Sequence, residues 1–197
     1  MQIGVREMTR DVVRARLAES VYDHFLENGF DETTVEEAAK AAGISRATFF
    51  RYFVSKEDAV IVAMSASQFN YADLLRTFEV NGDEPIWVHL RRAFEPAVVS
   101  AESDPARLRA KVRLISSIPS LRAHLAERRL LQEMLLAAAL GEQIRDPLTA
   151  KVLVAAALSS FDLAWREWGE QPDASSFRDL LDSIFARLSD PVVGLAR

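Results

Sequence analysis

Four basic side chains lie between Glu37 and Glu57 with no acid among them: Lys40, Arg46, Arg51 and Lys56. Guanidinium and ammonium groups donate hydrogen bonds to phosphate oxygens, and guanidinium also fits the acceptor edge of guanine. The whole chain of 197 residues carries a formal net charge of −5, from 24 basic and 29 acidic side chains. The sequence therefore predicts a local positive patch on an otherwise acidic protein.

Residues for enzyme chemistry are scarce. The chain has no cysteine, and its three histidines, His24, His89 and His124, are far apart without an H-x-x-x-H pair. This excludes thiol nucleophiles, disulfides and cysteine-ligated metal sites. No paired-carboxylate or glycine-rich phosphate signature is present either. We expect no metal, no cofactor and no enzymatic activity.

The composition is that of a globular protein, with 49% hydrophobic and 27% charged residues. The longest apolar runs, residues 134–140 and 152–158, are shorter than the roughly 20 residues that span a bilayer. Charged residues within the first ten positions do not fit a signal peptide. We expect a cytoplasmic protein without a membrane partner.

Glycines that follow segments of 3.6-residue apolar periodicity, and prolines at the start of the next segment, indicate an all-α protein. No segment alternates as a strand does. The pattern predicts nine helices, at about residues 9–28, 34–43, 45–53, 55–77, 85–101, 105–117, 119–140, 147–168 and 174–188. Pro96 should kink or break the fifth of these.

The second and third predicted helices, joined by Ala42-Gly43-Ile44, form a helix-turn-helix pattern. Thr34 and Glu37 match a capping box, and Ser45 can cap the second helix of the pair. Two phenylalanines of that helix, Phe49 and Phe53, are four residues apart and should point into the core.

The opposite face of the same helix carries Ala47, Thr48 and Arg51, flanked by Arg46 and Phe50. A small residue, a hydroxyl and two guanidinium groups are suited to base edges, thymine methyls and phosphates in a DNA major groove. Ordinary solvated charges are the alternative interpretation.

Residues 31–60, DETTVEEAAKAAGISRATFFRYFVSKEDAV, resemble the DNA-binding head of TetR (tetracycline-repressor-like) transcriptional regulators. The match covers about residues 9–60. It rests on Thr34-Val35, Ala42-Gly43-Ile44-Ser45, Phe50-Arg51-Tyr52-Phe53 and Ser55-Lys56-Glu57. The sequence departs from the family pattern at three positions: Ala38 stands for Ile, Ala47 for Gly and Phe50 for Tyr. Phe50 therefore lacks the hydroxyl that often reaches phosphate in this family, and Tyr52 is an alternative donor.

The resemblance implies a nine-helix, all-α TetR-like fold. A helix-turn-helix DNA-binding domain would occupy residues 1–54, a linker helix 55–77, and a ligand-binding and dimerisation domain 78–197. The DNA contacts it implies are Thr34, Ser45, Arg46, Ala47, Thr48, Phe50, Arg51, Tyr52 and Lys56. Thr34 is in the first place a helix cap.

Residues 109–123 resemble a TetR branch with an acyl-CoA-like ligand-binding domain, to which the regulator of mycofactocin clusters belongs. This implies an apolar effector, either an acyl-CoA or a fatty acid. The candidate pocket residues are Trp87, Phe94, Val98, Leu108, Val112, Ile115, Leu121, Met134, Phe161, Asp162 and Trp165. Each can instead be a packing residue, and Asp162 can be a solvated residue, an interface partner or a ligand contact.

A single short recognition helix reads only a few base pairs, so specificity requires two half-sites and a homodimer. We expect a palindromic double-stranded DNA operator, released when the effector binds. The dimer interface is predicted in helices 147–168 and 174–188, at Val152, Leu158, Phe177, Leu181, Ile184 and Phe185. The alternatives are a helical ligand-binding or adaptor protein without operator binding and a small helical enzyme.

Overall fold

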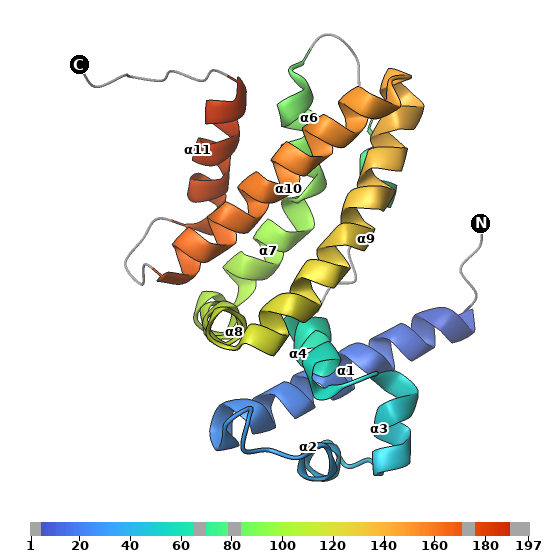
Figure 1. Ribbon diagram of the computed structural model, residues 1–197, viewed down its shortest axis with the longest axis vertical. Helices are drawn as coiled ribbons and strands as arrows, with labels where there is room; N and C mark the ends of the chain where they lie inside the picture. The colour runs from blue at the N-terminus through green and yellow to red at the C-terminus, as the bar shows by residue number, and fades with distance from the viewer. Residues whose placement is uncertain (1–4, 65–69, 79–83, 171–175, 190–197) are drawn as a thin grey trace. The chain divides into compact units, whose positions relative to one another are not determined.

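The computed structural model describes residues 5–64, 70–78, 84–170 and 176–189 (Figure 1). Within these ranges every regular element is an α-helix, so the predicted all-α class is confirmed. The helices are α1 Val5–Asn28, α2 Val35–Ala41, α3 Arg46–Tyr52, α4 Lys56–Met64, α5 Tyr71–Arg76, α6 Ile86–Ala93, α7 Glu95–Ser103, α8 Pro105–Ser117, α9 Pro119–Ile144, α10 Pro147–Glu170 and α11 Phe177–Ser189.

The predicted number of nine helices is wrong, because two expected helices are each divided. The stretch 55–77 contains α4 and α5, and Asn70 starts the second by accepting a hydrogen bond from the Asp73 backbone N–H (3.2 Å). The stretch 85–101 breaks at Phe94 between α6 and α7. The break places Pro96 in the first turn of α7, where its missing N–H leaves no helix hydrogen bond unmade.

The chain divides into two compact units. We call residues 1–68 with 118–125 the head, and residues 69–117 with 126–197 the body. In the head, α1 packs on α4 and α2, and α2 packs on α3. Its core is built from side chains that are almost completely buried: Ala18, Val21, Tyr22, Phe25, Phe49, Phe53 and the whole run 59–63 of α4.

In the body, α10 packs on α6, α8 and α11. Its centre is a group of aromatic rings in contact. Phe94 stacks on Phe161 with centroids 4.3 Å apart, and Trp165 stacks on Phe177 at 3.9 Å. Trp168 lies edge-on to both Trp165 and Phe177. Removal of these rings from water stabilises the body.

The predicted dimer-interface residues lie mostly inside a single chain. Phe177, Leu181 and Phe185 are at most 3% exposed, because α11 packs on α6, α7 and α10, and Leu158 is buried in the same core. These four residues are therefore covered within one chain, and the prediction that they form a dimer interface is wrong for them. Of the predicted set, Val152 remains exposed and Ile184 partly exposed.

Within the described residues, α10 is the one helix that is long and apolar enough, by length and composition alone, to cross a membrane. The core helix of a soluble protein passes the same test, so this is weak evidence for a membrane span. Nine residues of α10 are buried in the body, because the helix packs on α6, α8 and α11.

Candidate nucleic-acid interface

The start of α2 is held by the predicted capping box. The Glu37 backbone N–H donates to the Thr34 hydroxyl (3.3 Å), and the Thr34 backbone N–H donates to the Glu37 carboxylate (2.9 Å). The Thr34 hydroxyl also donates to that carboxylate (2.7 Å). These bonds, the one from the Thr34 backbone first, lower the pKa of Glu37 below its ordinary value of 4.5. Thr34 thus acts as a cap, as predicted.

The turn between α2 and α3 depends on a glycine. Gly43 has φ of 69°, in the left-handed region that side chains with a Cβ seldom adopt. A Cβ at this position would meet no atom within 4 Å, so the requirement is for conformation and not for space. The Ile44 backbone N–H donates to the Ala39 carbonyl (2.9 Å), which closes α2 and turns the chain toward α3.

α3 has one buried and one exposed face. Ser45 caps it by accepting from the Thr48 backbone N–H (3.1 Å). Phe49 and Phe53 lie in the head core with ring centroids 5.0 Å apart, as the spacing predicted. The side chains exposed on the other face are Arg46, Ala47, Phe50 and Arg51, with Thr48 and Tyr52 partly exposed beside them.

The two arginines of this face are held near the helix surface. Arg46 forms an ion pair with Glu36 of α2 (2.6 Å), and its guanidinium lies 5.1 Å from the centre of the Phe50 ring. Both members of the pair are exposed, so the interaction is worth less than about 1 kcal/mol and a phosphate can replace it. The Arg51 guanidinium lies over the Tyr52 ring at 5.2 Å.

Lys56 has a structural contact that the sequence did not predict. Its ammonium donates to the Phe30 carbonyl (2.7 Å) and lies 4.3 Å from the centre of the Phe30 ring. The lysine thereby joins the start of α4 to the segment between α1 and α2. The predicted DNA contact of Lys56 remains a prediction. Its ammonium already has the Phe30 carbonyl as a partner within the protein.

The end of α3 is anchored by residues that the sequence did not predict. Arg14 of α1 donates from Nε to the Tyr52 carbonyl (2.9 Å) and from Nη2 to Asp58 (2.7 Å). The same Asp58 oxygen accepts from the Val54 backbone N–H (3.2 Å), and His124 Nε2 lies 3.7 Å from the other oxygen. An acid directly before the apolar run 59–63 was the available signal, because a buried carboxylate needs a partner.

The predicted pocket residues separate into groups. Ten of the eleven are in the body, and seven of these are buried: Phe94, Val98, Leu108, Val112, Ile115, Phe161 and Trp165. Trp87 is partly exposed. Leu121 instead belongs to the head, and Met134 is 63% exposed on α9, so these two do not join the others. Asp162 forms an ion pair with Arg129.

Comparison with known proteins decides the family. The sequence profile described as "Bacterial regulatory proteins, tetR family" matches residues 20–61, which include α2, the turn and α3. A second profile, "MftR C-terminal domain", matches residues 84–193, more than half of the chain. The chain belongs to the TetR family of bacterial regulatory proteins.

Relatives of this TetR-family chain are also regulators. It is 27% identical over 201 residues to the HTH-type transcriptional regulator TcmR of Streptomyces glaucescens, covering 92% of this chain and 86% of that one. It is 28% identical over 119 residues to a putative mycofactocin biosynthesis transcriptional regulator, MftR, of Mycobacterium tuberculosis, covering 58% and 57%. The families and relatives are transcriptional regulators and not enzymes, as the sequence predicted.

Solved structures share the fold. The FadR repressor of Thermus thermophilus, in complex with lauroyl-CoA, has a TM-score of 0.62 at 22% identity, covering 93% of this chain and 97% of that one. FadR of Bacillus subtilis, in complex with stearoyl-CoA, has a TM-score of 0.59 at 17% identity, covering 90% and 98%. The chain therefore has a TetR-like fold, and its families and relatives identify it as a transcriptional regulator.

Proposed function

We propose that this TetR-family regulator is a cytoplasmic, homodimeric repressor that binds a two-fold symmetric operator and leaves it when an apolar effector binds. Each subunit places α3 in the major groove. The observation that carries the proposal is the division of α3 into a buried face, Phe49 and Phe53, and an exposed face with Arg46 and Arg51. The N-terminus of α3 adds partial positive charge that favours a phosphate.

The proposed dimer uses the exposed apolar side of α10. Leu148 and Val152 are 71% and 61% exposed, and Leu163 is 38% exposed. At 100° per residue these three positions lie within about 60° of one another around the helix. Ile184 of α11, which is partly exposed, extends the predicted interface to the last helix. An exposed apolar stripe of this kind is typical of a protein–protein interface. A regulator that binds two half-sites needs two subunits, so we expect the stripe to be buried between two copies of the chain.

The proposed effector is an acyl-type molecule that binds in the body. Support comes from the aromatic centre of the body and from the FadR structures, which were solved with lauroyl-CoA and stearoyl-CoA. Repression is relieved if the ligand favours a conformation in which the two heads are wrongly spaced for DNA. The coupling free energy that this requires is about 1–3 kcal/mol.

The test begins with selection of duplexes from a randomised DNA pool by the full chain, followed by binding of the selected duplex at increasing salt. We expect a palindromic sequence and an affinity that falls steeply with salt, because phosphate contacts release counterions. Lauroyl-CoA, free fatty acids and CoA alone are then compared as releasing agents. If no sequence is enriched from the randomised pool, operator binding is refuted. If no acyl compound releases the selected duplex, the proposed effector class is refuted.

A further inference from the structure

The ion pair between Arg129 of α9 and Asp162 of α10 lies at the edge of the aromatic centre of the body. Arg129 Nη2 is 2.5 Å from Asp162 Oδ1, and the two side chains are 16% and 39% exposed. The guanidinium also lies over the Phe161 ring, 4.9 Å from its centre. Phe161 in turn stacks on Phe94. A charged pair is thus in contact with the apolar interior on one side.

The guanidinium is incompletely satisfied in this position. Nη1 donates to the Gln132 side chain (3.0 Å) and Nη2 contacts Asp162, but Nε is buried without a hydrogen-bond partner. Buried donors of this kind are uncommon and costly, so an unpaired one calls for an explanation. A ligand oxygen that replaced Asp162 at this guanidinium could accept a hydrogen bond from the unpaired Nε–H as well.

Tyr71 packs on the same aromatic rings as the pair. Tyr71 lies edge-on to both Phe94 and Phe161, at 5.1 and 5.9 Å between centroids. Burial raises its pKa to about 12, with Arg129 and Asp162 near enough to act on it by their charges. Tyr71 is therefore an uncharged donor at neutral pH. The Arg129 guanidinium and the Tyr71 hydroxyl are both hydrogen-bond donors. Such donors favour a ligand with an anionic oxygen group, such as a carboxylate.

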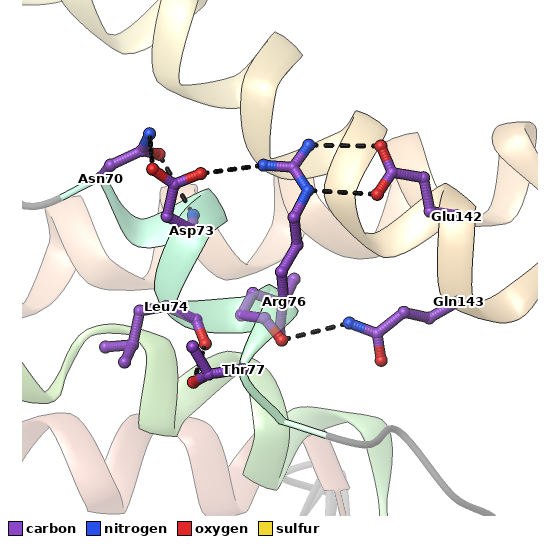
Figure 2. Close-up of polar contacts among 8 residues, drawn as sticks. Asn70, Asp73, Leu74, Arg76, Thr77, Glu142 and Gln143 are labelled. Atoms are coloured by element: carbon purple, nitrogen blue, oxygen red, sulfur yellow. Dashed lines mark hydrogen bonds and ion pairs between the residues drawn. The ribbon is translucent and has the colours of Figure 1, made fainter. Parts of the chain in front are cut away.

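Another arginine of the body shows what a purely structural pair looks like (Figure 2). Arg76 donates from Nε and Nη2 to the two oxygens of Glu142, at 3.1 and 3.2 Å, and from Nη1 to Asp73 at 3.1 Å. All its donor nitrogens are used, and α5 is thereby fixed to α9. Arg129 differs because it lies against aromatic rings and keeps an unused donor.

We infer that Arg129 and Tyr71 bind the carboxylate of an apolar carboxylic acid, and that Asp162 exchanges Arg129 for Arg166 when the acid binds. This rests on the proposed effector-responsive function. Arg166, an exposed residue one helical turn along α10, already acts on Asp162 by its charge. The exchange replaces one carboxylate at Arg129 by another, so no buried charge is left unpaired. Leu130, which is exposed and follows Arg129 in sequence, and Phe161 behind the pair would contact the apolar part.

The experiment measures binding of decanoate and of 1-decanol, which has the same chain without the charge, by quenching of intrinsic tryptophan fluorescence in the full chain. Wild type should bind decanoate at least about tenfold more tightly, as charge-assisted hydrogen bonds to arginine predict. Arg129→Gln should abolish this preference, and Tyr71→Phe should reduce it. Arg76→Gln, the matched control, should leave it unchanged.

Asp162→Asn should raise the affinity for decanoate, whereas Arg129→Gln should lower it. Removal of the competing carboxylate should strengthen decanoate binding several-fold and leave 1-decanol binding unaltered, a gain that damage to the fold does not produce. Equal binding of both probes by wild type, or an unchanged preference in Arg129→Gln, would overturn the inference. If lauroyl-CoA still releases operator DNA in that case, the proposed function stands and only the carboxylate site is wrong.

Discussion

Asp58 is the residue at which three parts of the head meet. Its carboxylate accepts from Arg14 of α1 and from the Val54 backbone N–H, and it lies near His124 of α9. Since the side chain is only 8% exposed, its removal leaves Arg14 without a counter-charge in a partly buried position. The residue therefore contributes to where α3 ends as well as to stability.

Replacement of Asp58 should accordingly be much more damaging than replacement of a surface acid. We expect Asp58→Ala to lower the free energy of unfolding by about 2–4 kcal/mol. This lies between the losses typical of breaking an exposed and a fully buried ion pair. Urea unfolding followed by circular dichroism measures this. Glu36→Ala, which removes the exposed partner of Arg46, is the control and should cost less than about 1 kcal/mol. Equal losses would contradict the role assigned to Asp58.

The residues that sequence could predict are those whose partners are close in the chain. The caps Thr34 and Ser45 were predictable because each bonds a backbone N–H three positions ahead. The buried face of α3 followed from a four-residue spacing. Arg14 could not be predicted, since its partners Tyr52 and Asp58 are 38 and 44 positions away. Distant pairings depend on how helices pack, which local patterns do not contain.

Among the helices, the capping box of α2 carries a pH dependence. The lowered pKa of Glu37 means that its carboxylate stabilises the folded head when charged. That contribution is complete above the unfolded pKa, near 4.5, and is lost as the pH falls through the lower folded value. Helix α2, which has only 7 residues, depends on such capping more than a long helix does.

Glu37→Gln should therefore be less stable than wild type at pH 7, and the difference should shrink as the pH is lowered below 4. Thermal unfolding of both proteins across this range, compared pair by pair, isolates the contribution of Glu37 from that of the other acids. A difference that grows toward acid pH would contradict the assignment, because it would require a raised pKa.

Helix boundaries show the same limit of local patterns. The start of α8 at Pro105 and its end at Ser117 agree with the sequence prediction, since proline and helix periodicity determine them locally. The division of 55–77 into α4 and α5 was missed. Asn70 can cap a helix, yet whether the chain uses that cap depends on packing of α5 against α6 in the body.

At the scale of the whole molecule, the dimer proposal predicts a specific weak point. Val152→Glu on α10 should shift sedimentation from dimer to monomer at micromolar concentration and abolish operator binding, because the charge would be buried between two copies. Val99→Glu, on a similarly exposed valine of α7, is the matched control and should leave the dimer intact. A Val152→Glu protein that still sediments as a dimer would place the interface elsewhere.

The most direct test of the central claim, that the exposed face of α3 reads DNA, is the affinity of Arg51→Ala for a selected duplex and for a duplex of unrelated sequence. We expect a loss of about tenfold or more on the selected duplex, as for a base-edge contact of about 1–3 kcal/mol, and a much smaller loss on the unrelated duplex. Helix content and oligomeric state should not change, and Arg76→Ala in the body should bind as wild type does. If Arg51→Ala binds the selected duplex as tightly as wild type does, the exposed face of α3 does not read the DNA sequence through Arg51.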